Sequence, residues 1–355
     1  MINEKERRRL RQNRPRAALR ARPGGSRDRT PPLSNSRLAI LLNPMAGGGR
    51  AGRSREKLES LLRENALSFD LYITESEERL KALSREMAAE GRTIVGAGGD
   101  STFHLIINEI IKAGGRAPFG MLGLGSSNDI TREFGLEPLE RAVAALKRGR
   151  TRAVDLGCLK QGDNVLRYFL GQANMGLGVE VNCYVDGLAR RRPWLARRQT
   201  LAGTLGIMRA FRKRQVPLDL VIQSTEGTFK GSFIVAVFSN TRYWATGKLI
   251  APQARPDDGR LDACLIEKCS FLRLARINSL AKRGWQAKKK TLPSEGCPQP
   301  DRPVHIRGVK FLQSAEFTVS SGPALNIQAD GEIISLDPGK PLLIKAKPRA
   351  LRIIY

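Results

Sequence analysis

The chain has 355 residues, which is enough for two domains because single domains usually run to about 100–200 residues. Its 61 Lys and Arg against 34 Asp and Glu give a formal net charge of +27, which attracts polyanions such as nucleic acid, anionic membranes or phosphorylated ligands. Five scattered cysteines, none in a C-x-x-C pair, and only two histidines argue against a disulfide framework, a zinc site and histidine-based metal catalysis.

Residues 1–36 form a basic tail of Arg with Pro, Gly and Ser, too poor in apolar residues to fold alone. We predict a disordered arm, with a polybasic lipid tether and a targeting peptide as the alternatives. No apolar segment follows the tail as in a secretory signal, and no apolar run reaches the roughly 18–20 residues needed to span a bilayer. The sequence predicts a cytoplasmic protein with peripheral membrane association.

From Leu38 onward, short apolar segments alternate with amphipathic ones. The pattern predicts strands at Leu38–Leu42, Phe69–Ile73, Thr93–Gly96 and Ala117–Leu122, and helices at Arg53–Leu62, Leu80–Ala89 and Thr102–Ile111. This alternation is typical of a parallel sheet with crossover helices. Glycine-containing turns follow several of the strands, at the edge of the sheet where ligands bind in open α/β proteins.

After about Thr151 the predicted elements are mainly strands, with few helices between them apart from a basic one near Ala202–Arg212. Strands are expected at Tyr168–Ala173, Leu218–Gln223, Ser232–Ser239, Leu261–Ile266, Phe317–Val319 and Leu325–Gln328. The last stretch, Leu342 to Tyr355, is rich in strand formers and is expected to return and close the structure. The sequence therefore predicts an α/β domain followed by a mainly antiparallel β domain.

The strongest single motif is Gly98-Gly99-Asp100-Ser101-Thr102, which lies between a predicted strand and a predicted helix. Paired glycines let the backbone approach a phosphate closely, and a helix N-terminus offers unpaired N–H groups and a positive dipole end. The Asp100 carboxylate would repel phosphate unless a cation or water lies between them, which points to Mg²⁺. Taken alone, the motif is also compatible with an ordinary turn.

Two better-known phosphate motifs are absent or weak. The chain has no G-x-x-x-x-G-K-[ST], which excludes a P-loop. Gly47, Gly49 and Gly52 satisfy G-x-G-x-x-G, but Asn43-Pro44 separates them from the preceding strand. They therefore do not form the tight strand-to-helix turn of a dinucleotide site.

Five further loop motifs accompany the Gly-Gly-Asp turn, and the six occur in a fixed order. They are Asn43-Pro44 with its glycines, Gly125-Ser126-Ser127-Asn128-Asp129, Asp155-Leu156-Gly157, Asp257-Asp258-Gly259-Arg260-Leu261-Asp262 and Asp330-Gly331-Glu332. Together they resemble the diacylglycerol kinase catalytic-domain family, which includes bacterial lipid kinases, sphingosine kinases and ceramide kinases. The resemblance covers about residues 36–355.

The resemblance implies an ATP- and Mg²⁺-dependent kinase of phospholipid biosynthesis. Its acceptor would be the hydroxyl of diacylglycerol or of a sphingoid or ceramide-like lipid at a membrane surface. The implied fold is α/β, with a three-layer nucleotide-binding domain at residues 37–150, completed by 336–355, and an antiparallel β-sandwich substrate domain at 151–335.

The resemblance also implies roles for individual residues. Nucleotide contacts fall on Asn43, Thr74, Gly98, Gly99, Asp100, Thr102, Ser126 and Asn128. Asp100, Asp129 and Asp155 would organise catalytic Mg²⁺ through waters, and Asp258 would hold a second, structural Mg²⁺. Glu332 matches the proposed general base, with Asp100 as the other catalytic residue. The structural alternatives are a strand end at Asn43, a turn cap at Asp155, and hairpin turns at Asp258 and Asp330.

Several positions depart from the family pattern. Ser101 replaces a glycine, and its Cβ would disfavour a positive φ and crowd a phosphate. His104-Leu105 stand in place of an Asn-Glu pair, Ser126-Ser127 replace Thr-Gly, and Ala245-Thr246-Gly247 replace a glycine triplet. These changes leave two alternatives open: a catalytically weak or inactive nucleotide- or polyanion-binding protein, and a soluble-substrate kinase resembling NAD kinase.

Two clusters place tryptophan among cations, as interfacial membrane anchors often do. They are Arg190-Arg191-Arg192-Pro193-Trp194 and Lys282-Arg283-Gly284-Trp285, and solvated loops with a half-buried tryptophan are the alternative. No recognition helix, zinc finger or aromatic RNA platform is evident, so no specific nucleic-acid partner is expected. The expected partners are the lipid substrate and an anionic membrane, and a homodimer is left open.

Overall fold

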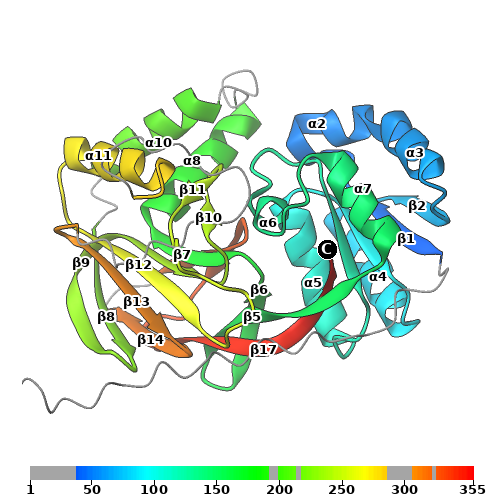
Figure 1. Cartoon of the computed structure of the whole chain (residues 1–355). Coiled ribbons are helices and arrows are strands. Elements are labelled where there is room, and N and C mark those ends of the chain that lie inside the picture. Colours follow the sequence, from blue (N-terminus) through cyan, green and yellow to red (C-terminus); the bar gives the residue numbers. More distant parts are fainter. Residues whose placement is uncertain (1–36, 192–198, 213–216, 286–305, 322–324) are drawn as a thin grey trace, which may run out of the picture.

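The computed structural model describes residues 37–191, 199–212, 217–285, 306–321 and 325–355. Two lobes lie side by side, one built from the first part of the chain and the other from the middle part (Figure 1). The predicted disordered tail, Trp194 and its neighbouring arginines Arg192, Arg197 and Arg198 lie outside the described residues.

The first lobe contains a parallel sheet in the order β2-β1-β3-β4, flanked by helices. Every residue of β1 and β3 is buried, as expected for parallel strands covered on both faces. The strands are β1 (Leu38–Leu42), β2 (Phe69–Ile73), β3 (Ile94–Gly98) and β4 (Phe119–Gly123). The helices are α2 (Ala46–Arg53), α3 (Arg55–Glu64), α4 (Glu77–Ala89), α5 (Asp100–Lys112), α6 (Asp129–Glu133) and α7 (Leu139–Arg148).

The second lobe is mainly antiparallel and is covered on one side by three helices (Figure 1). Its strands are β5 (Thr151–Gln161), β6 (Asn164–Phe169), β7 (Gln172–Gly176), β8 (Leu218–Ser224), β9 (Gly227–Ser239), β10 (Tyr243–Trp244), β11 (Lys248–Leu249), β12 (Leu261–Glu267), β13 (Val309–Ser314), β14 (Glu316–Ser321), β15 (Asn326–Ala329) and β16 (Glu332–Ser335). Its helices are α8 (Leu177–Arg191), α10 (Gln199–Arg212) and α11 (Phe271–Lys282).

The last strand, β17 (Leu342–Ile354), joins the lobes (Figure 1). It pairs antiparallel with β5 and β14 and parallel with β4, so all the strands of both lobes except β10 and β11, which pair with each other, form one 15-stranded sheet. Leu351, Ile353 and Ile354 lie in the hydrophobic core of the first lobe, so the C-terminal strand does return to it. The predicted fold class, an α/β domain with an antiparallel β domain, is confirmed; the exact domain limits stay a prediction.

Three elements were not expected. The glycine run of α2 has left-handed φ values of 63°, 68° and 82° at Gly47, Gly48 and Gly49, conformations that glycine adopts without steric cost. Helices α8 and α11 are not among the predicted elements, which after Thr151 are mainly strands with one basic helix. In addition, the strand predicted at Tyr168–Ala173 is broken, because β6 ends at Phe169 and β7 begins at Gln172.

The role of Trp285 as a membrane anchor is wrong. Its side chain is 4% exposed, packs edge-on against Phe311, and donates a hydrogen bond from Nε1 to the Leu249 carbonyl. A tryptophan satisfied in this way is part of the core and cannot reach headgroups. None of the described helices is long and apolar enough to cross a membrane.

Candidate active site

A cavity of about 710 Å³ lies where the loops of the first lobe face the helices and sheet of the second. Its polar part is lined by the Asn43–Gly47 segment, the Gly99–Thr102 turn and the Gly125–Asp129 loop. These three segments follow β1, β3 and β4, whose carboxyl ends meet at one edge of the parallel sheet. The volume is in the range of small-molecule sites, about 300–1,000 Å³.

The Gly-Gly-Asp turn forms the start of α5. Gly99 is the N-cap residue, with extended backbone, and Asp100 is the first residue of the helix. A Cβ on Gly125 would lie 2.5 Å from the Gly99 Cα. Glycine is therefore required where the loop after β4 touches the loop after β3. Ser101 lies within α5 and is not among the residues with positive φ, so the expected backbone strain at Ser101 is wrong.

Asn43 ties the first loop to α5. Its Nδ2 donates to Thr102 Oγ1 over 3.0 Å, and its Oδ1 accepts from the Met45 backbone N–H over 3.0 Å. Asn43 therefore fixes both the turn after β1 and the hydroxyl of Thr102. Both residues line the cavity, together with Gly99, Asp100, Ser126 and Asp129 from the predicted set.

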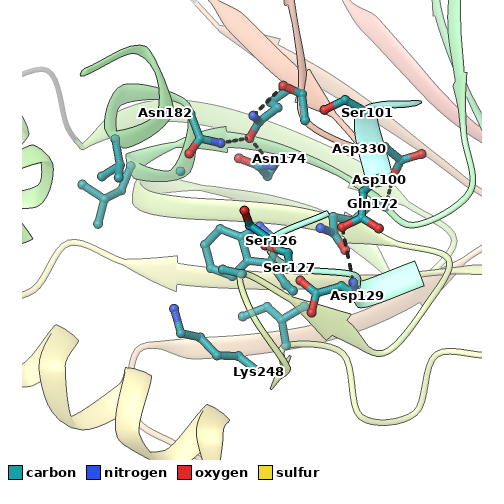
Figure 2. Close-up of a pocket in the computed structure, with 18 of the residues that line it drawn as sticks. Asp100, Ser101, Ser126, Ser127, Asp129, Gln172, Asn174, Asn182, Lys248 and Asp330 are labelled. Atoms are coloured by element: carbon teal, nitrogen blue, oxygen red, sulfur yellow. Dashed lines mark hydrogen bonds between the residues drawn. The ribbon is translucent and has the colours of Figure 1, made fainter. Parts of the chain in front are cut away.

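Three carboxylates gather at this end of the cavity, from Asp100, Asp129 and Asp330 (Figure 2). Asp100 accepts long hydrogen bonds, 3.3 Å each, from the backbone N–H groups of Asp129 and Ile130. Burial raises the pKa of Asp100 to about 7, and the charges of Asp129 and Asp330 add to the shift. Burial and the two neighbouring carboxylates therefore favour the protonated form in Asp100 more than in an exposed aspartate.

Asp129 is held more firmly than Asp100. It accepts backbone N–H bonds from Thr246 and Gly247 and forms an ion pair with Arg132 at 2.7 Å. Burial nevertheless raises the pKa of Asp129, against the effect of these donors. These bonds connect the Ala245–Gly247 segment of the second lobe to the loop that carries Asp129.

The donor set fits a cation that is held indirectly. Among the described residues, no group of three or more His, Cys, Asp or Glu side chains could hold a metal ion. Asp100 and Asp129 already accept bonds from protein donors, which leaves their remaining lone pairs for waters. Mg²⁺ commonly keeps several waters and binds through one or two carboxylates plus phosphates, so this arrangement suits it.

The other predicted site residues do not line the cavity. Thr74 is buried and donates from Oγ1 to the Leu42 carbonyl, which joins the ends of β1 and β2. Asn128 has a left-handed φ of 52° and donates to the Gly123 carbonyl, so it shapes the loop before α6. Gly98 ends β3, where a Cβ would lie 2.5 Å from Thr102 Oγ1.

Asp155 and Asp258 belong to a second cluster. Asp155 is fully buried, and its two oxygens accept from the backbone N–H groups of Gly259 and Arg349 at 2.6 and 2.7 Å. Asp258 accepts from the Arg260 N–H over 3.0 Å, and burial raises its pKa, with Asp155 adding to the shift. Asp155 is not among the residues that line the cavity, whereas Asp100 and Asp129 are, and its predicted Mg²⁺ role stays a prediction.

Glu332 begins β16 and is half-buried outside the cavity lining. Burial raises the pKa of Glu332, with an opposing effect from His104 and a reinforcing one from Glu77. These neighbours belong to α4 and α5. The general-base role of Glu332 stays a prediction.

Asp330, from the same Asp-Gly-Glu motif, is the residue that lines the cavity instead. Its carboxylate accepts three backbone N–H bonds, from Leu170, Gly171 and Gln172, at 2.8–2.9 Å. It thereby fixes the connection between β6 and β7. His104 Nδ1 is 3.7 Å from Asp330 Oδ2, where the family pattern has an asparagine. Asp330 and Gly331 also form the two-residue turn between the antiparallel strands β15 and β16, so the hairpin alternative is confirmed and the carboxylate contacts are additional to it.

Lys248 also lines the cavity, although the sequence analysis did not predict it as a site residue. Of the described residues that line the cavity, it is the single basic one. Its Nζ lies 5.7 Å from the centre of the Trp244 ring, and burial lowers its pKa, as does Lys282, whereas Asp129 opposes the shift. Figure 2 shows Lys248 on the opposite side of the cavity from Asp330. No sequence motif marks this position.

Beyond the carboxylates, the cavity becomes apolar. This part lies between α8, α10 and α11 and the faces of β9 and β12. It is lined by Leu177, Val181, Ile207, Val235, Ile250, Ile266, Phe271, Leu274, Ile277 and Ala281. One cavity therefore combines glycine-containing loops of the kind that bind phosphate with an apolar chamber that suits a hydrocarbon chain.

Comparison with known proteins agrees with this geometry. The family model for the diacylglycerol kinase catalytic domain matches residues 37–159, and that for the YegS C-terminal NAD kinase beta sandwich-like domain matches 171–292. A diacylglycerol kinase of Mycobacterium tuberculosis is 24% identical over 321 residues, covering 90% of this chain and 94% of the relative. One of Staphylococcus saprophyticus is 23% identical over 314 residues, covering 87% and 93%.

The fold is shared with solved structures as well. The crystal structure of a diacylglycerol kinase from Bacillus anthracis superposes with a TM-score of 0.62 at 15% identity, over 90% of this chain and 97% of that one. At that identity the likeness concerns the fold alone. The two family models together take in more than half of the chain, and it belongs to the diacylglycerol kinase catalytic-domain family, a family of lipid kinases.

Proposed function

We propose that the protein transfers the γ-phosphoryl group of ATP to the hydroxyl of a lipid alcohol. The observation that carries this proposal is the continuity of the cavity from the glycine loops and carboxylates to the apolar chamber. A polar, soluble acceptor would leave the ten apolar lining residues in contact with water. An acyl chain would cover them, and burying apolar surface stabilises a complex by about 25 cal/mol per Å².

In this arrangement the lipid hydroxyl oxygen bonds to the γ-phosphorus as the bond from that phosphorus to the bridging oxygen of ADP breaks. Asp100 accepts the hydroxyl proton, because it lines the cavity at the start of α5, beside the loops that face the phosphates. The N–H groups at the start of α5 and the glycine loops face the phosphates. Bound Mg²⁺ would neutralise phosphate charge, with Asp100 and Asp129 orienting its waters.

The test is label transfer from γ-labelled ATP with Mg²⁺ to lipid alcohols in mixed micelles, beside a parallel reaction with NAD. A labelled lipid is the expected product. A labelled NAD would favour the soluble-substrate kinase that the NAD kinase-like description of the second domain suggests. ATP binding by folded protein without any labelled product would instead indicate a binding protein.

Lys248→Met is expected to lower kcat/KM for lipid phosphorylation by about 100-fold, the scale of losing one donor that stabilises transition-state charge. We infer that this cation contacts the transferring phosphoryl group, because it is the single basic group on the described cavity lining. Lys340→Met, at an exposed position paired with Asp337, is the control and is expected to leave the rate unchanged. Equal rates for wild type and Lys248→Met would refute the contact.

We also propose that the enzyme works at an anionic membrane surface, which the formal charge of +27 supports. Binding to phosphatidylglycerol-containing vesicles is expected to fall steeply when salt is raised from 0.05 to about 0.5 M, because the screening length shortens from over ~10 Å to a few Å. Co-sedimentation measures it, with vesicles of pure phosphatidylcholine as the control. Binding that does not depend on salt or on anionic lipid would contradict the proposal.

A further inference from the structure

Four of the amide side chains that line the cavity come from strands and a helix of the second lobe. Gln172 and Asn174 come from β7, Gln328 from β15 and Asn182 from α8. Asn174 and Gln328 are direct cross-strand partners, and alternation along each strand turns both toward the cavity while Ala173 and Ile327 enter the core. Figure 2 shows Gln172 beside Asp100, with Asn174 and Asn182 farther from that end.

Hydrogen bonding fixes which way three of these amides point, those of Asn174, Asn182 and Gln328. Gln328 Nε2 donates to the Gly331 carbonyl over 2.9 Å, and a carbonyl can only accept, so Gln328 must present Oε1 to its other neighbours. That oxygen accepts from Asn174 Nδ2 at 3.2 Å and from Asn182 Nδ2 at 2.8 Å. Asn174 must therefore direct its own oxygen elsewhere, toward the start of α8, where a Cβ on Gly178 would lie 2.5 Å from it.

This network leaves Asn174 Oδ1 without a donor, and Gln172, which lies outside the network, has a second unpartnered oxygen. Within the described part of the chain, Asn174 Oδ1 and Gln172 Oε1 are buried and have no hydrogen-bond partner. Asn174 is only 2% exposed. A buried acceptor without a donor is unfavourable, so a ligand that brings a donor to it is favoured over one that does not.

From these two unpartnered oxygens we propose, on the basis of the proposed lipid kinase activity, that the enzyme prefers an acceptor lipid whose headgroup carries a second hydrogen-bond donor beside the reacting hydroxyl. That donor is a further hydroxyl or an amide N–H. Diacylglycerol has one hydroxyl, which reacts, and its ester oxygens would face Gln172 Oε1 and Asn174 Oδ1 acceptor to acceptor. A monoacylglycerol or an N-acylated amino alcohol supplies the missing donor.

The test compares kcat/KM for three oleoyl lipids in identical detergent micelles: 1,2-dioleoylglycerol, 1-monooleoylglycerol and N-oleoyl sphingosine. The wild type is expected to favour monooleoylglycerol, which has one donor besides the reacting hydroxyl, and N-oleoyl sphingosine, which has two, over dioleoylglycerol by about tenfold. Gln172→Met removes one acceptor at nearly constant size and is expected to reduce this preference about fivefold. Asn164→Leu, at an exposed position on β6, is the matched control and is expected to keep the wild-type preference.

Asn174→Leu removes the other acceptor and gives a second variant should Gln172→Met fail to fold, as judged by thermal unfolding and ATP binding. The inference is overturned if dioleoylglycerol is the best acceptor, or if every folded variant keeps the wild-type preference. Either result leaves the lipid kinase activity in place. Failure of all three lipids to become labelled by protein that binds ATP would overturn the kinase proposal and this inference together.

Discussion

Asp100→Asn is expected to lower kcat for lipid phosphorylation by about 1,000-fold while the protein stays folded. A positioned general base contributes about 10²–10⁴ to a rate, and the carboxylate also orients the waters of the bound cation. Asparagine keeps the shape and one acceptor for the N–H groups of Asp129 and Ile130. It also removes the repulsion from Asp129 and Asp330, so the melting temperature should stay the same or rise.

Single-turnover kinetics with labelled ATP, together with thermal unfolding, measure both effects. Asp163→Asn, at an exposed turn between β5 and β6, serves as the control. Glu332→Gln is the informative comparison. Because Glu332 does not line the cavity, this variant is expected to lose less activity than Asp100→Asn. A larger loss in Glu332→Gln would return the base role to Glu332, and near-normal activity in Asp100→Asn would exclude Asp100.

Sequence patterns located the first lobe well because its elements are locally determined. The strands β1 and β2 were predicted at the residues where they occur, because each is a short, mainly apolar run between turn signals, fully buried in β1 and partly buried in β2. Helix α8 was missed because Val179, Val181 and Val185 with Gly178 and Gly187 disfavour an isolated helix. It forms because it packs against α10 and covers the cavity, which are tertiary effects.

The residues of the candidate site also fall into those that local sequence signals mark and those that only the tertiary fold brings together. Residues in glycine-rich loops, such as Asn43 and Asp100, stand beside recognisable turn signals. Lys248 and the amides do not: Asn174 and Gln328 are 154 residues apart and meet only because β7 pairs with β15. The motifs also could not show which of their side chains point into the cavity. Asp330 faces the cavity and Glu332, two residues later, lies outside its lining.

Asp155→Ala is expected to lower the free energy of unfolding by about 3 kcal/mol, because two partly buried N–H groups lose a charged acceptor worth roughly 1.5–3 kcal/mol per bond. The Asp155 carboxylate accepts from the backbone N–H groups of Gly259 and Arg349. The backbone N–H of Asp155 donates to the Pro256 carbonyl over 2.7 Å. Asp155 thus fastens the loop after β11 to the bulge in β17, between Lys347 and Leu351. Urea unfolding at fixed protein concentration measures the change.

The same experiment separates this structural role from the predicted Mg²⁺ role. If Asp155 only fastens loops, the loss is equal in EDTA and in millimolar Mg²⁺, since no ion depends on it. If Asp155 helps to bind the ion, Mg²⁺ stabilises the wild type by mass action and the variant lacks that increment, so the difference widens with Mg²⁺. The direct bonds to both Asp155 oxygens favour the first result, and Asp163→Ala, which is exposed, provides the reference.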